Sequence, residues 1–187
     1  MCSGEGKGSV ARSDEETSEA RRSLAFSTAN TMLRSKLMAW APVPMRLIIG
    51  YGFMAHGFAK LGRGPDHFAG ILQALGMPLP KLLSWITIVV EIGGGLAIAL
   101  GAFVTAVSIP MIAILLVAIF TVHLPNGFSS IKLQAVTQTG AQFGQPGYEC
   151  DLLYLAGLLV LMLGGSGPLA VDRYRTAFWR TASTRGS

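Results

Sequence analysis

The feature that most constrains the fold is a series of long apolar stretches that are almost free of charge. Between Lys81 and Lys132 the only Asp, Glu, Lys or Arg residue is Glu91. Of all 187 residues, 51% are hydrophobic and 13% are charged, whereas typical soluble domains carry about a quarter charged residues. Most of the remaining charges lie near the two ends of the chain and in polar connections. The sequence therefore predicts an all-α membrane protein that crosses the bilayer several times.

Four apolar segments approach or exceed the length of about 17–25 helical residues that crosses the hydrocarbon core. These predicted spans cover residues 44–61, 79–100, 102–124 and 148–164. Basic residues flank the first and last spans more densely than they flank the two longer connections: Arg34, Lys36, Arg173, Arg175 and Arg180, against Arg63, Lys81 and Lys132. The positive-inside rule then places both termini in the cytoplasm. The prediction is a four-transmembrane-helix bundle over residues 43–173, with both ends inside.

Polar segments flank this predicted bundle. Residues 1–40 lack an apolar core and mix acidic with basic residues, which predicts a disordered tail rather than a secretory signal. An interfacial helix over residues 21–40 is the alternative, because several large apolar side chains recur there at near-helical spacing. The Met codons at positions 32 and 38 are alternative starts, so the sequence leaves open whether residues 1–36 belong to the protein. Residues 174–187 are expected to form a basic cytoplasmic tail.

Charge and cysteine usage argue against several other classes of function. The formal net charge is +5, but the basic residues are divided between the termini and form no aromatic-interleaved patch, so no nucleic-acid partner is predicted. Lys and Arg beside anionic lipid explain the charge better, which makes the bilayer the expected partner. Cys2 and Cys150 form no C-x-x-C pair and the three histidines lack zinc-like spacing, so no metal site is predicted.

Glu91 is the residue that most requires a partner. A charge at the bilayer centre costs about 3 kcal/mol on insertion scales, and a mid-span carboxylate is out of reach of the surface. The following Gly94 and Gly95 let a neighbouring helix approach the face that Glu91 uses. We therefore predict a hydrogen bond, direct or through one water, from Glu91 to another span. His56 or Lys60 is the first expected partner, and His123 or Tyr148 is the second.

The predicted topology places polar residues from all four spans in the outer half of the membrane. They are His56, Lys60, Glu91, His123, Tyr148 and Glu149. His56 and Lys60 share one helix face because they are four residues apart. Two interpretations remain open: hydrogen bonds that fix the order of the helices, or a functional polar pocket. Arg46, in the first turn of the first span, is expected to snorkel to the headgroups.

Short motifs occur in a fixed order across the four predicted spans. They are Arg46 with Gly50, His56-Gly57-x-x-Lys60-Leu61, Glu91-x-Gly93-Gly94, Gly101, His123-x-x-Asn126-Gly127, Gly147-Tyr148-Glu149, and Gly167-Pro168 with Asp172. Over residues 43–173 this set resembles the DoxX family. The resemblance implies a small four-helix protein of the bacterial inner membrane. Relatives include a subunit of a thiosulfate:quinone oxidoreductase and components of membrane oxidative-stress complexes, which implies a redox setting and a quinone cofactor.

A quinone site needs donors for two carbonyl oxygens and groups that deliver protons. The candidate quinone-binding residues are His56, Lys60, His123, Tyr148 and Glu149, and the candidate catalytic proton relay or charge pair is Glu91 with His56 and Lys60. The first of three open functions is a quinone-linked subunit of a membrane oxidoreductase, acting with a redox partner protein or as a homo-oligomer. The second is a non-catalytic anchor or assembly component, and the third is a small-solute permease. Four short helices without a repeat are few for alternating access.

Overall fold

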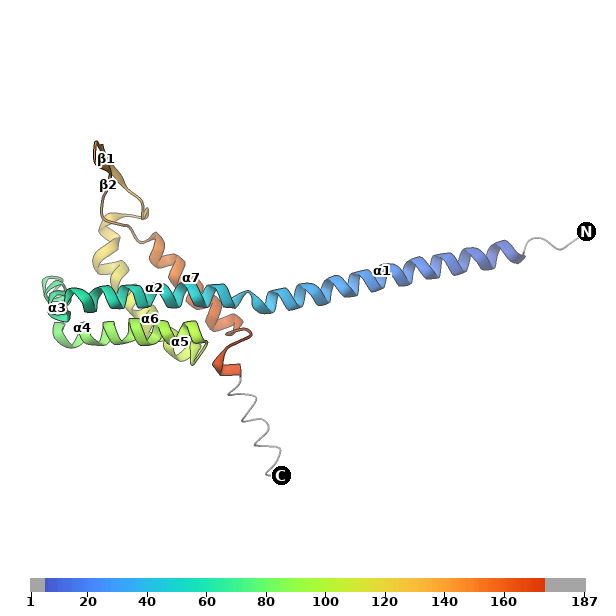
Figure 1. Cartoon of the computed structure of the whole chain (residues 1–187), viewed down its shortest axis with the longest axis horizontal. Helices are drawn as coiled ribbons and strands as arrows, with labels where there is room; N and C mark the ends of the chain where they lie inside the picture. Colours follow the sequence, from blue (N-terminus) through green and yellow to red (C-terminus); the bar gives the residue numbers. More distant parts are fainter. Residues whose placement is uncertain (1–5, 174–187) are drawn as a thin grey trace, which may run out of the picture. The chain divides into compact units, whose positions relative to one another are not determined.

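The computed structural model describes residues 6–173, with side chains from residue 21 onward, and most of these residues are helical (Figure 1). The chain divides after Trp40 into two compact units. In the first unit, α1 runs without interruption over Gly6–Trp40, where the composition predicts a disordered tail. A low apolar content excludes a packed core, but residues 9–40 contain no Gly or Pro and many good helix formers, which favours a lone helix. Whether residues 21–40 lie on a membrane surface stays a prediction.

The second unit contains the predicted spans, and their observed bounds lie within three residues of the predicted ones. Helix α2 covers Pro42–Arg63. The next span consists of α4 (Pro80–Val89), the π-helical turn η1 (Val90–Gly94) and α5 (Gly95–Leu100), and the third of α6 (Val104–Ala118), the π turn η2 (Ile119–His123) and the 3-10 turn η3 (Leu124–Asn126). The last is α7 (Glu149–Gly164). Proline at the first turn begins both α2 and α4, where its missing N–H leaves no bond unmade.

Three helical stretches in the described part of the chain are long and apolar enough to cross a membrane. They are Arg21–Arg63, which contains α2, then Pro80–Leu100 and Val104–Asn126. The fourth predicted span, α7, has 16 residues, slightly fewer than the roughly 17 that a crossing helix usually needs. The protein is therefore mostly helical with three candidate spans, and a crossing by α7 is not established by length.

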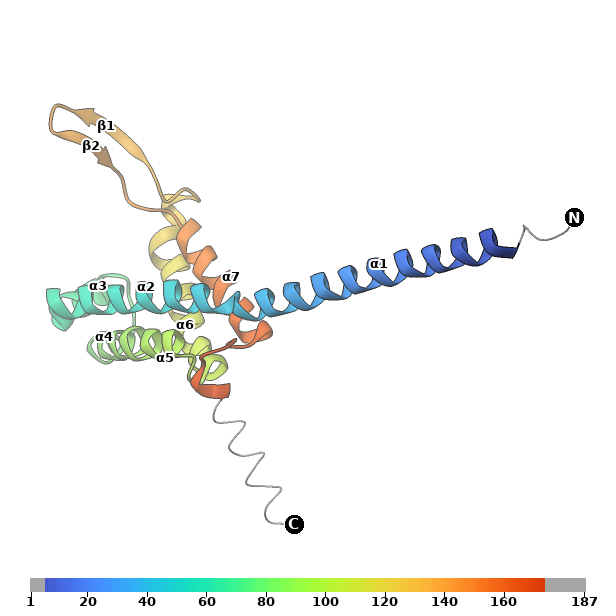
Figure 2. The same cartoon turned by 45° about the vertical axis from the view of Figure 1, so that its right-hand side comes forward.

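The core of the second unit is shared by all four predicted spans. Buried side chains from α2, α5, α6 and α7 form one cluster: Ile49, Phe53, Ile98, Val104, Met111, Leu115, Leu158 and Leu161. Helix α2 lies alongside α4 and α5 in both views (Figures 1 and 2). Glycines allow this approach, because a Cβ built on Gly50 would lie 2.5 Å from the carbonyl oxygen of Gly95. Small residues of this kind drive close helix packing in membranes.

The first connection contains a helix that the sequence does not predict. Helix α3 covers Pro65–Ala74, in a segment expected to be an irregular polar link. It packs on α4, and the buried Ser84 hydroxyl donates a 2.8 Å hydrogen bond to the Pro65 carbonyl oxygen. Pro65 at the first turn and Asp66 beside the positive helix end both favour a helix start here.

The second connection makes the all-α prediction wrong in detail. Strands β1 (Leu133–Thr137) and β2 (Gly140–Phe143) form an antiparallel hairpin whose residues are all exposed. It projects away from the helices (Figure 2). The sequence predicts only a polar connection here, but Val, Thr and Phe in β1 and β2 are strand-forming residues. Below the hairpin, the carbonyl oxygens of residues 127–129 accept the N–H groups of residues 147–149, and the Ser130 hydroxyl accepts the Cys150 N–H. Any Cβ on Gly147 would collide with the Gly127 carbonyl oxygen.

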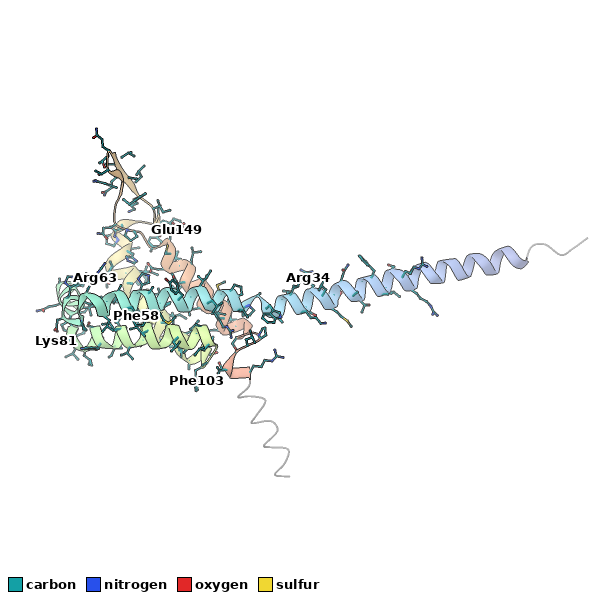
Figure 3. The ribbon with its side chains drawn as sticks, in the orientation of Figure 1. Arg34, Phe58, Arg63, Lys81, Phe103 and Glu149 are labelled. Carbon is teal, nitrogen blue, oxygen red and sulfur yellow. The ribbon has the colours of Figure 1, made fainter. Side chains whose placement is uncertain are left out.

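The chain returns after α7 to the end of the unit where α5 and α6 meet. Gly101 makes this turn with φ +67°, a conformation that favours glycine. Its carbonyl oxygen accepts the Asp172 N–H at 3.1 Å. The Asp172 carboxylate in turn accepts the N–H groups of Phe103 at 2.8 Å and Val104 at 3.1 Å, which caps α6 (Phe103 is labelled in Figure 3). We call Gly101–Val104 with Pro168–Asp172 the return junction.

Candidate functional site

The centre of the candidate site is an ion pair between α2 and the π turn η1. The Lys60 ammonium donates a hydrogen bond to Oε1 of Glu91, which confirms the predicted contact of Glu91 with another span. Glu91 is 4% exposed, whereas 24% of the Lys60 side chain is exposed. The pair therefore has one buried member and one member that reaches the surface of the unit.

Gly57 explains why the two helices meet at this level. A Cβ built on Gly57 would lie 2.6 Å from Cγ1 of Ile92 and 3.0 Å from the Cβ of Glu91. Glycine one turn before Lys60 thus lets α2 approach the turn that carries Glu91. The motif His56-Gly57-x-x-Lys60 consequently has a packing role at its glycine and an electrostatic role at its lysine.

The second carboxylate oxygen of Glu91, Oε2, is also buried. Among residues 6–173 no group forms a hydrogen bond with it. An ionised carboxylate oxygen accepts hydrogen bonds, and a protonated one donates. A buried polar atom without a partner is costly, at about 1–3 kcal/mol. Oε2 is therefore positioned to accept a hydrogen bond or a proton from a group that binds beside Lys60.

The Lys60 ammonium makes a second contact, with the connection that follows α2. It lies 4.9 Å from the centroid of the Phe68 ring on α3, within the range of a cation–π interaction. Lys60 thus contacts both a carboxylate and an aromatic ring. Helix α3 thereby becomes part of the site, a role that the sequence does not predict.

Glu91 in the second span and His123 in the third span both lie in π-helical turns. Glu91 is the second residue of η1, and His123 is the last residue of η2. A π turn inserts an extra residue into a helix, weakens the regular hydrogen-bond ladder, and occurs frequently at functional sites. Two such turns, each with a titratable side chain, distinguish these positions from ordinary packing positions.

A second pair joins η2 to α7. Nδ1 of His123 is in contact with Oδ2 of Asp151, a residue that the predicted site omits. The signal for Asp151 lies in its spacing, because it precedes the buried Leu158 and Leu161 by seven and ten residues and so shares their helix face. An acidic residue in the first turn of α7 also suits the positive end of the helix dipole.

The remaining predicted site residues do not join these pairs. His56 is exposed, and within residues 6–173 no hydrogen bond or ion pair involves it. The Tyr148 ring packs edge-to-face on Phe128, with centroids 5.7 Å apart. Glu149 accepts the Ser130 N–H at 3.0 Å, so it anchors the second connection (Glu149 is labelled in Figure 3). The structure therefore divides the predicted pocket into two ion pairs and a loop anchor.

Arg46 also departs from its predicted place. It was expected to snorkel to the headgroups, but it is 2% exposed and lies against the return junction. Its Nη2 donates to the Pro168 carbonyl oxygen at 3.3 Å. The reason is the return of the chain after α7, which covers the first turns of α2.

Residues 41–124 match the sequence model of the DoxX family. This segment includes Lys60, Glu91 and His123, together with both π turns. Over this segment, which is just under half of the 187 residues, the chain is similar to the DoxX family. Searches of curated proteins and of solved structures found no match. The match to this membrane family and the three candidate spans among the described residues together support a multi-pass membrane protein. The DoxX match ends before the hairpin and α7, so Asp151 lies outside it.

Proposed function

We propose that this protein is a quinone-linked subunit of an oxidoreductase complex in the bacterial inner membrane, and that Lys60 and Glu91 form its quinone site. The observation that carries the proposal is the buried Oε2 of Glu91, which has no partner although Oε1 is paired. An oxygen of this kind can accept a hydrogen bond or a proton from a ligand bound beside Lys60. The π turn at Glu91 adds support.

The residues present fit a quinone in both of its redox states. A quinone carbonyl oxygen is an acceptor, and the partly exposed Lys60 ammonium is a donor that can serve it. A quinol hydroxyl is a donor, and Oε2 of Glu91 is an acceptor without a partner. When bound, a quinone supplies two-electron, two-proton redox chemistry. In this scheme Lys60 orients the head group and Glu91 holds a proton at Oε2.

The proposal narrows the candidate residues. Lys60 and Glu91 keep their roles as a charge pair, and Phe68 joins them through its contact with Lys60. His56, Tyr148 and Glu149 are not assigned a quinone contact. His56 is exposed, Tyr148 packs on Phe128, and Glu149 accepts the Ser130 N–H. His123 with Asp151 is assigned to proton exchange where the third span contacts α7.

Titration with a soluble ubiquinone analogue and its quinol tests the site. Glu91→Gln keeps the shape of the side chain but removes its charge, and we expect it to weaken quinol binding about tenfold, since charge-assisted hydrogen bonds are roughly twice as strong as neutral ones. Tryptophan fluorescence of the purified protein follows the binding. The matched control is Asp66→Asn, an exposed carboxylate at the start of α3. Absence of saturable binding to the unmodified protein, or equal binding by Glu91→Gln, would contradict the proposal.

We further propose that α7 crosses the membrane, so that both termini are cytoplasmic. Support comes from the return junction, where Asp172 after α7 bonds to Gly101 between α5 and α6, and where Pro168 meets Arg46 of α2. An even number of crossings brings the chain back to its starting side. Residues 34 and 36 before α2, both basic, suit the cytoplasmic side.

Alkaline phosphatase fusions test this topology. A fusion after Thr137, in the hairpin, is expected to be active because the enzyme folds only outside the cytoplasm. A fusion after Arg173 is expected to be inactive, and a fusion of a cytoplasmic reporter there should be active. Equal phosphatase activity at both positions would show that α7 does not cross.

A non-catalytic anchor is the second candidate, and one observation favours it. Both ion pairs join different helices, as pairs that fix helix order do. An anchor requires no quinone binding, so the titration above separates it from the first candidate.

A further inference from the structure

Arg46 is a buried cation whose side chain is largely unsatisfied. It lies in the first turns of α2 and is 2% exposed. Only Nη2 has an acceptor, the Pro168 carbonyl oxygen at 3.3 Å, which is a long hydrogen bond. Nε and Nη1 are buried and have no hydrogen-bond partner in the described part of the chain. One N–H on Nε and two on Nη1 are thus left without acceptors.

The groups around Arg46 do not supply the missing charge. The nearest part of the return junction presents Gly101 and Ala170, and a Cβ on Gly101 would collide with Nη1. The Asp172 carboxylate accepts the N–H groups of Phe103 and Val104 at the start of α6. A buried cation without a counter-charge is destabilising. A neutral water can satisfy an N–H but cannot offset the charge.

We propose that Arg46 binds the phosphate group of a membrane lipid. The guanidinium fork matches phosphate oxygens in geometry and charge, and this pairing is among the strongest hydrogen-bonded contacts. Arg46 is the fifth residue of α2, and the predicted topology begins the first span at residue 44, which would bring Arg46 to the level of the lipid phosphates. Pro168–Ala170 then lies over the bound group and links it to the end of α7.

The site is independent of the Lys60–Glu91 pair. Arg46 and Lys60 are separated by 14 positions on α2, or about 21 Å at 1.5 Å per residue. A phosphate at Arg46 therefore has a structural or regulatory role at the return junction, whether or not the protein binds a quinone.

Thermal unfolding of the full chain in a neutral detergent tests the proposal. Dioleoyl phosphatidylglycerol is expected to raise the melting temperature by about 5 °C at a concentration near 100 times its Kd. Dioleoylglycerol, which has the same acyl chains and no phosphate, should leave it unchanged. Inorganic phosphate is the third arm, and an equal rise with it would support the anion site while identifying a free anion as its source.

Two arginines of the same helix provide the matched variants. Arg46→Gln is expected to abolish the rise with phosphatidylglycerol, whereas Arg63→Gln, at an exposed arginine at the other end of α2, should retain it. Arg46→Lys keeps the charge without the fork and should weaken binding about tenfold, which gives a second reading if Arg46→Gln fails to fold. The proposal is overturned if the unmodified protein responds equally to both lipids, or if either Arg46 variant responds as the unmodified protein does.

Discussion

Replacing Lys60 with methionine is expected to lower the free energy of unfolding by about 3 kcal/mol, because it leaves the Glu91 carboxylate buried without its cation. The value lies at the lower end of the range for buried pairs, since 24% of the Lys60 side chain is exposed. Unfolding of the purified protein in mixed micelles of increasing SDS content measures the change. Methionine is similar in length, so lost packing contributes little to the result.

Lys81→Met is the control for this change. Lys81 is exposed in the first turn of α4, and its replacement is expected to alter stability by less than about 0.5 kcal/mol. Equal effects of the two substitutions would indicate that Lys60 does not stabilise Glu91. The double variant Lys60→Met/Glu91→Leu removes both charges and is expected to recover most of the stability, as apolar replacement of whole buried pairs often does.

The second large effect is expected at Gly95. A Cβ there would lie 2.6 Å from the Gly50 carbonyl oxygen and 2.9 Å from the Met54 backbone nitrogen. Neither backbone atom can move alone, so Gly95→Ala must separate α2 from α5. We expect a loss of about 2–3 kcal/mol, the usual range for overpacking a close contact, measured by the same SDS titration.

Gly93→Ala is the matched control for Gly95→Ala. Gly93 is exposed, lies two residues earlier, and has open space where its Cβ would be placed. Its replacement is expected to be neutral or to stabilise the helix by up to about 1 kcal/mol, because alanine restricts the unfolded chain more than glycine does. A greater loss at Gly93 than at Gly95 would contradict the described contact between α2 and α5.

The helices of the second unit follow largely from apolar length and from proline and glycine at their ends. The predicted range 79–100 corresponds to Pro80–Leu100 and 102–124 to Val104–Asn126. The elements that were missed, α3 and the hairpin, are short and lie in polar connections, where hydrophobic length carries no signal. The π turns were also beyond prediction, because they depend on how neighbouring helices pack around Glu91 and His123.

The Lys60–Glu91 contact was predictable because a mid-span carboxylate has few alternatives, but the place of His56 was not. The i,i+4 spacing relates His56 to Lys60 without showing which face of α2 meets η1. That face contains the buried residues Arg46, Gly50, Phe53 and Gly57, and Lys60 follows them at the same helical spacing. His56 lies beside this face and remains exposed. The sequence likewise does not show whether Asp151 or Glu149 faces the neighbouring helices, because this depends on which face of α7 is buried.

The central claim is that the Lys60–Glu91 pair binds a quinone rather than only joining two helices. The most direct measurement is quinone binding by the double variant Lys60→Met/Glu91→Leu, with its melting temperature determined in the same preparation. A structural pair and a binding pair both allow this variant to fold, but only a binding pair requires that it lose its ligand. We predict a folded protein whose affinity for the ubiquinone analogue falls at least about tenfold, since each lost charged hydrogen bond is worth roughly 1.5–3 kcal/mol. A folded double variant that binds the analogue as tightly as the unmodified protein would contradict the claim.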